Sequence, residues 1–134
     1  MTASTILDIA NGVAEKLEDY NADVVFAPDY ELKNMKDMRV VVLPVGREVG
    51  FATRAAKDNV FAVEVGVIHK CREQAAVPSL VQKVEEIGLK LHGATIGTCM
   101  CMKVKWEPMF SVEDLRSRGL FISVLHLSFK EYTS

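Results

Sequence analysis

The stretches Arg39-Val-Val-Val-Leu-Pro-Val45 and Val60-Phe-Ala-Val-Glu-Val-Gly-Val-Ile-His69 decide the fold. Both are rich in β-branched residues and are bounded by turn-forming residues, which is typical of paired strands. In the second stretch one face is strongly apolar and the other is mixed, as expected for a sheet that helices cover on one side. The two stretches therefore predict a pair of strands around which the rest of the chain is organised.

A long polar connection, residues 46–59, joins these two strands. Ordinary hairpin loops have about 2–5 residues, so a longer connection is either functional or mobile. Alternatively, its flanking residues extend both strands into an arm beyond the core. Because aromatic residues and Arg are enriched at binding hot spots, Phe51 and Arg54 are candidate anchors on a neighbouring protein, although a solvated hairpin tip explains the composition equally well. The candidate subunit or tube interface comprises Arg47, Glu48, Val49, Phe51, Arg54, Lys57 and Asp58.

One amphipathic helix is predicted before the strand pair in the sequence, and a second one after it. In residues 5–20 and 77–91, apolar residues recur at helical spacing and form one face that a core buries. Thr5 and Asp8 match a capping box, Pro78 suits a first helical turn, and Gly93 suits a helix end.

Three further strands are predicted. Residues 24–26 form a short one. In residues 98–106, strict alternation places Met100, Met102, Val104 and Trp106 on one face, and the two cysteines and two lysines on the other. Between this strand and the last, Ser111 and Asp114 match a second capping box. Residues 120–129 are apolar on both faces, which indicates a central strand or one whose outer face a partner covers.

The element order predicts one α+β domain spanning residues 1–134. We expect a mainly antiparallel β-sheet, with the two amphipathic helices packed on one face and a long hairpin-type loop. Of the 134 residues, 49% are apolar and 25% are charged, which is ordinary for a globular protein.

The bulk charge and hydropathy restrict the function. The formal charge of −2 gives no overall attraction to nucleic acid or to an anionic membrane. No apolar run approaches the ~20 residues that a membrane span needs, and the first residues do not resemble a signal peptide. Three cysteines do not suit a disulfide framework, which favours a reducing cytosol or an assembly made there.

Catalytic and metal-binding patterns are weak. Cys99 and Cys101 offer soft ligands for zinc or copper, but alternation puts Met100 and Met102 on the opposite face, and His69, His92, His126 and Cys71 have no motif spacing. No nucleophile elbow or phosphate-binding glycine motif is present. We therefore expect no enzyme activity, no cofactor and no metal, while a small-ligand or metal-binding module stays as an alternative.

Several stretches resemble small tail-assembly proteins of tailed bacteriophages, and the element order resembles their tail terminator, or tail completion, family. The stretches are Leu32-Lys-Asn-Met-Lys-Asp-Met-Arg-Val-Val-Val-Leu-Pro-Val-Gly-Arg-Glu48, Thr53-Arg54 ahead of Val60 to Val67, Val81-Gln-Lys-Val-Glu-Glu-Ile87, and Trp106-Glu-Pro-Met-Phe-Ser-Val-Glu-Asp-Leu-Arg116 before Phe121-Ile-Ser-Val-Leu-His-Leu-Ser-Phe129.

The resemblance implies a structural virion protein. Such proteins form a ring, typically a homohexamer, that caps the tail tube, ends its polymerisation and provides the joint to the head. The implied partners are other copies of the chain, the tail tube protein and a head-completion or neck protein, without membrane or specific nucleic-acid binding. The implied location is the virion tail or neck, after assembly in the host cytoplasm. A head-side neck or connector protein of similar architecture is the alternative.

Overall fold

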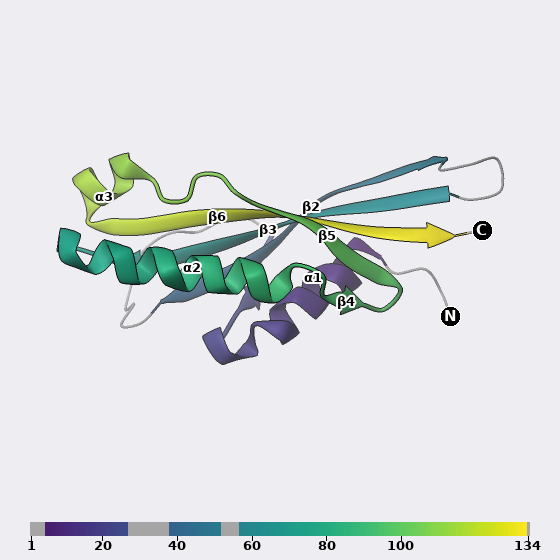
Figure 1. Ribbon diagram of the computed structural model, residues 1–134, viewed down its shortest axis with the longest axis horizontal. Helices are drawn as coiled ribbons and strands as arrows, with labels where there is room; N and C mark the ends of the chain where they lie inside the picture. Colours follow the sequence, from purple (N-terminus) through teal and green to yellow (C-terminus); the bar gives the residue numbers. More distant parts are fainter. Residues whose placement is uncertain (1–4, 27–37, 52–56, 134) are drawn as a thin grey trace.

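The computed structural model describes residues 5–26, 38–51 and 57–133 (Figure 1). Short 3₁₀ turns (η) accompany the helices and strands. In chain order the elements are α1 (Ile6–Lys16), η1 (Glu18–Tyr20), β1 (Asp23–Val24), β2 (Arg39–Phe51), β3 (Lys57–Lys70), η2 (Gln74–Ala76), α2 (Val77–Leu91), β4 (Thr95–Ile96), β5 (Cys99–Trp106), α3 (Val112–Arg118) and β6 (Leu120–Thr133).

The described strands form one six-stranded sheet in the order β1-β2-β3-β6-β5-β4. The predicted α+β class is confirmed, and so is the mainly antiparallel pairing. The short strand β1 is the exception, because it lies parallel to β2 and makes the sheet mixed. The longest ladder joins β3 to β6, from Lys57 opposite Thr133 to Lys70 opposite Leu120, so β6 is a central strand.

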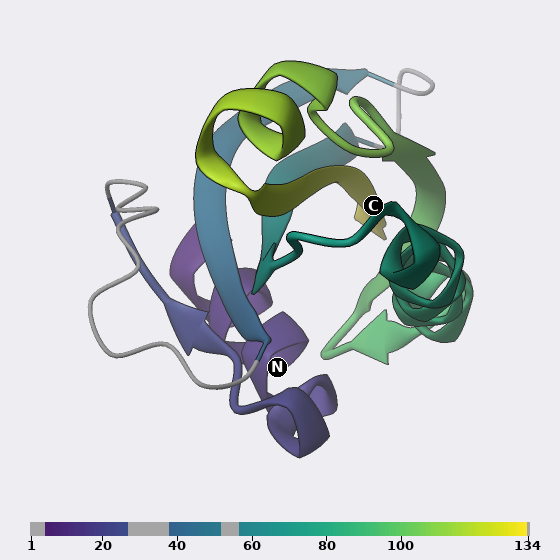
Figure 2. The same cartoon turned by 90° about the vertical axis from the view of Figure 1, so that its left-hand side faces the viewer.

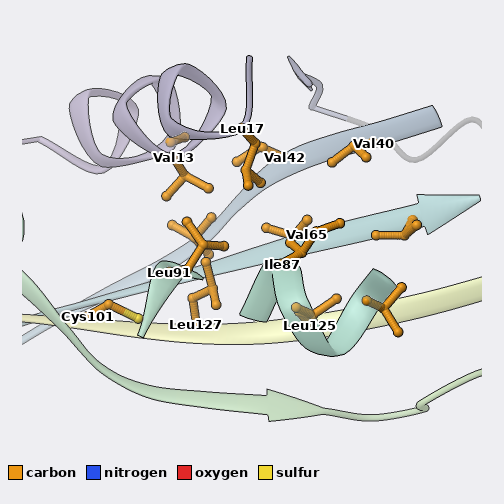
Figure 3. Close-up of a cluster of buried hydrophobic side chains, with 14 of the residues drawn as sticks. Val13, Leu17, Val40, Val42, Val65, Ile87, Leu91, Cys101, Leu125 and Leu127 are labelled. Carbon is orange, nitrogen blue, oxygen red and sulfur yellow. The ribbon is translucent and has the colours of Figure 1, made fainter. Parts of the chain in front are cut away.

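Helices α1 and α2 cover one face of this curled sheet, as predicted (Figure 2). Thr5 and Asp8 form the expected capping box at the start of α1, and Pro78 lies in the first turn of α2. The apolar stripes of both helices pack against the apolar face of β2, β3 and β6 (Figure 3). Completely buried members of this core include Val13, Leu17, Val42, Val65, Ile87, Leu91 and Leu125.

A close approach fixes α2 against β5. The indole Nε1 of Trp106 donates a hydrogen bond to the carbonyl oxygen of Val84, at 2.9 Å. The ring lies so near Gly88 that a Cβ atom there would overlap it. Glycine at this position therefore serves packing, although glycine inside a helix costs about 1 kcal/mol relative to alanine.

The predicted alternation of β5 is wrong beyond Cys101. The pairing with β6 shifts between Cys101 and Lys103, because Met102 is an extra residue in a β-bulge. Cys99 and Cys101 are buried, while Val104 and Trp106, after the bulge, also pack against the core. A bulge reverses the facing of every later residue, so a single inserted position defeats a period-2 prediction.

The opposite face of the sheet carries a smaller apolar cluster. Ile68 and Ile122 face each other across β3 and β6, with Val41, Leu120 and the partly buried Val25 beside them. The first residues of β6 therefore contribute to both clusters, because Phe121 lies in the main core and Leu120 and Ile122 lie in the smaller one. This explains why the sequence of the last strand is apolar on both faces.

Candidate interaction surface: the β2–β3 arm

The residues predicted to form a long loop are mostly strand. β2 continues to Phe51 and β3 begins at Lys57, with Gly46 opposite Ala62 and Phe51 opposite Lys57. The loop interpretation is therefore wrong for these residues, and the alternative of two extended strands is confirmed. Arg54 lies outside the described residues, and so do the side chains of Phe51 and Lys57.

We use "the arm" for residues 46–51, 57–60 and 130–133. These are the distal parts of β2, β3 and β6, hydrogen-bonded side by side. In Figure 1 they run past the ends of α1 and α2, with the chain's C-terminus at the same end. The arm thus projects beyond the part of the sheet that the helices cover. Because no helix covers the arm, a neighbouring subunit can reach it.

A β-bulge lies at the base of the arm. The pairing of β2 with β3 shifts between Pro44 and Gly46, leaving Val45 as the extra residue with 52% of its surface exposed. Proline lacks a backbone donor and suits such an interruption at the edge of a sheet. Because of the shift, Arg47 and Val49 follow Val42 and Pro44 on the same side of β2, opposite Phe61 and Asn59.

A polar network occupies the arm where the core would otherwise continue. Glu131 is only 1% exposed, yet its carboxylate accepts hydrogen bonds from the Asn59 amide, at 3.5 Å, and from the Thr98 hydroxyl. The Cys99 thiol also points to this carboxylate, at 3.7 Å. A buried carboxylate is costly unless it is hydrogen-bonded, and here three elements supply donors. The network therefore joins β3 and β6 to the β4–β5 turn.

Arg47 links β2 to this network. Its Nη2 donates to Asn59 Oδ1 at 3.0 Å, and its guanidinium lies 5.0 Å from the centre of the Phe61 ring. A stacked guanidinium with a hydrogen-bonded partner is held in a defined orientation. Arg47, a candidate interface residue, is thus exposed but already orders the arm within its own subunit.

The other face of the arm is open and mixed in character. Glu48, Val60, Lys130 and Met100 lie in one row across β2, β3, β6 and β5. Lys130 forms an ion pair with Asp58 at 3.6 Å. Glu48 and Met100 are exposed, and so is Val49 on the reverse side, at 54%. Charges beside exposed apolar groups suit a contact surface with a polar rim.

The candidate residues Arg47, Glu48, Val49 and Asp58 do come together on one projecting element. The sequence interpretation missed Asn59, Glu131, Thr98 and Lys130. A signal for two of them was present, because Asn59 continues the i, i+2 series of Phe61 and Val63, and Glu131 continues that of Leu127 and Phe129. Extending the alternation past the apolar residues would have placed both on the core side.

The three cysteines are buried, whereas the three histidines are exposed or half-buried. Among the described residues Cys71, Cys99 and Cys101 form no disulfide and are buried, and burial raises the pKa of the Cys101 thiol above its ordinary value. His126 contacts Glu64, at 3.3 Å, and the Glu107 carbonyl oxygen. Over residues 5–26, 38–51 and 57–133, no group of three or more His, Cys, Asp and Glu is arranged to hold a metal ion.

The charges of β5 are partly satisfied within the chain. The Lys105 ammonium donates a hydrogen bond to the Glu107 carboxylate, with 2.5 Å between Nζ and Oε2. This hydrogen bond, together with the attraction between the charges, lowers the pKa of the exposed Glu107 carboxyl. Ser111 caps α3 by accepting from the Asp114 backbone N–H, but its own N–H donates to the Ile122 carbonyl oxygen, so only half of the predicted capping box forms.

Comparisons with protein-family models and with curated proteins return no match. The resemblance to tail terminators therefore stays a prediction. In the part of the chain that the structure describes, no helix is long and apolar enough to cross a membrane.

Proposed function

We propose that this chain is a structural protein of a phage tail, which closes into a ring on the last ring of the tail tube and stops its polymerisation. The ring also provides the surface to which the head side joins. This conclusion starts from the resemblance over residues 32–129 and depends on one structural observation, the arm that projects past the helix-covered core.

The form of the arm supports a role in assembly. A closed ring needs a heterologous contact, in which one patch of a subunit meets a different patch of the next. Exposed Val45 lies at the base of the arm, and the arm carries Glu48 on one face and exposed Val49 on the other, while Glu131 and Asn59 hold its strands in a defined arrangement. An ordered arm loses less conformational entropy on binding than a flexible loop does, so more of its contact energy appears as affinity.

The first experiment is negative-stain microscopy and mass measurement of the purified full-length protein over a range of concentrations. We expect a closed ring, a hexamer by the resemblance, that forms as the concentration rises. Adding the protein to tail tube protein during its polymerisation should give shorter tubes with one end capped. A chain that stays monomeric and leaves tube growth unchanged would overturn the proposal, and a ring that binds a head connector instead of the tube would favour the neck alternative.

The second experiment removes the arm tip. Replacing residues 50–58 with Asn-Gly, a favoured two-residue hairpin turn, joins Val49 to Asn59, which face each other in the ladder, and so keeps the pairing of β2 with β3 in the helix-covered core. We expect a folded monomer, judged by circular dichroism and sedimentation. If the shortened chain assembles as the full chain does, the tip of the arm has no part in the ring.

A further inference from the structure

Among the described residues, the sheet has an incompletely paired edge on each of its two sides. Within the described residues, pairing on the outer side of β2 ends where Val25 donates to the carbonyl oxygen of Val42. On the other side, β4 covers only the start of β5, and no described strand pairs with the outer edge from Met102 to Trp106. Unpaired strand edges present rows of backbone donors and acceptors, and another strand satisfies them best.

We propose that the open edge of β2, residues 45–51, pairs with the open edge of β5, residues 102–106, in the next copy of this chain. The pairing would join the sheets of neighbouring subunits into one continuous sheet. This inference rests on the proposed ring, and it identifies the two surfaces that close it.

Strand direction favours this pairing. β2 is antiparallel to β3, β3 to β6, and β6 to β5, so β5 runs opposite to β2. Rotation about a ring axis that lies roughly along the strands keeps these directions. The edge of β2 in one copy then meets β5 of the next copy in antiparallel orientation, and the two surfaces differ, as a closed ring requires.

Charges on the two edges are complementary. Glu48 lies on the outer face of β2, because it is opposite Val60, which pairs with Lys130. Lys103 lies on the same outer face of the sheet, opposite Ser128. In the described part of the chain neither Glu48 nor Lys103 has an ion-pair partner, and both are exposed. Opposite charges that face each other across adjacent strands stabilise the pair.

The register is consistent with a closed sheet. Gly46, Ala62, Ser128 and Lys103 lie in one row across the four strands. A straight continuation would set Gly46 opposite the next copy's Lys103. Closing a sheet tilts the strands and staggers their register, and a stagger of two residues brings Glu48 level with Lys103. Both edges also carry an exposed bulged residue, Val45 and Met102.

The test is a charge exchange in the full-length protein. Glu48→Lys and Lys103→Glu should each raise the concentration at which half of the protein is assembled by about tenfold, which is the effect of ~1.4 kcal/mol. The double variant should recover most of the loss, because it restores opposite charges at the contact. Glu85→Lys and Lys83→Glu on the exposed face of α2 are the matched controls and should leave assembly unchanged.

Hydrogen exchange gives the direct readout of the backbone pairing. Amides of residues 45–50 and 102–106 should exchange at least about tenfold more slowly in the assembled protein than in a monomeric variant. The edge pairing is overturned if the protein assembles but tolerates both charge reversals, or if its edge amides exchange as in the monomer. The ring proposal would then still stand. A wild-type chain that never assembles overturns both proposals.

Discussion

In the ladder between β3 and β6, Val65 faces Leu125 and Val63 faces Leu127, whereas in the arm Asn59 faces Glu131. The first two pairs belong to the core half, which α1 and α2 cover, and the third belongs to the arm half. Burying an aliphatic side chain contributes about 1.5–3 kcal/mol, and a hydrogen bond contributes only about 0.5–1.5 kcal/mol net. Along the same two strands, the core half thus contributes most of the folding free energy, whereas the hydrogen bonds of the arm half mainly fix how its strands are arranged.

This difference separates folding from assembly. Substitutions in the core half should unfold the subunit, while substitutions on the surface of the arm should leave a folded subunit that assembles poorly. The comparison fails if the two halves respond alike, and the following predictions test each half.

The largest effect is expected for Leu125→Ala. Leu125 is 0% exposed and packs in the cluster shown in Figure 3. Removing a buried leucine side chain costs its transfer free energy plus that of the cavity, about 2–5 kcal/mol in the free energy of unfolding. Urea unfolding measures the loss. The matched arm variant Val49→Ala should change stability by less than about 0.5 kcal/mol, and equal losses would contradict the division.

The next effect is expected for Glu131→Ala. The variant removes the acceptor shared by Asn59, Thr98 and Cys99, and leaves buried polar groups unsatisfied. Each such group costs about 1–3 kcal/mol. We expect a loss of stability in that range and faster hydrogen exchange in residues 57–60. Glu131→Gln keeps one acceptor oxygen and should lose less, whereas equal losses would show that the carboxylate is not what the network needs.

Local patterns were sufficient to predict α2 and the buried face of β3 in the core half. The period of 3.6 in residues 77–91 and the alternation of Phe61, Val63, Val65 and Val67 gave the helix and the buried face, because both elements bury a regular face. The caps at Thr5 and Ser111 were also readable, since a cap depends only on residues three apart.

The arm half was not predicted in the same detail. The β-bulges at Val45 and Met102 depend on how a neighbouring strand pairs. The alternation of apolar and polar residues along a single strand does not reveal them. The contact of Glu131 with Thr98 joins residues far apart in the chain, and it satisfies a carboxylate that alone would be read as exposed. Candidate interface residues could therefore be placed on the arm, but the residues that hold the arm in shape could not be identified.

A smaller effect distinguishes two glycines. Gly88→Ala inserts a methyl group where the Trp106 ring already lies, and overpacking of this kind costs about 1–3 kcal/mol, reduced by alanine's better helix propensity of about 1 kcal/mol. We expect a net loss of stability near the lower end of that range, measured by thermal unfolding. Gly50→Ala in the arm meets nothing within 4 Å and should be neutral within about 0.5 kcal/mol. A neutral Gly88→Ala would mean that α2 shifts away from β5 freely.

The smallest effect concerns Cys101, which faces Phe129 at the boundary between the two halves. Burial raises the pKa of its thiol, so above the ordinary thiol pKa the unfolded chain ionises while the folded chain stays neutral. The thiol's contribution to stability is therefore complete below the unfolded pKa and is lost as the pH rises through the folded pKa. Urea unfolding at pH 7 and pH 10 should show a larger alkaline loss for the wild-type chain than for Cys101→Ala, because the other titrating groups cancel between the two proteins. Equal losses would mean that water reaches this thiol, and that the core half ends before Cys101.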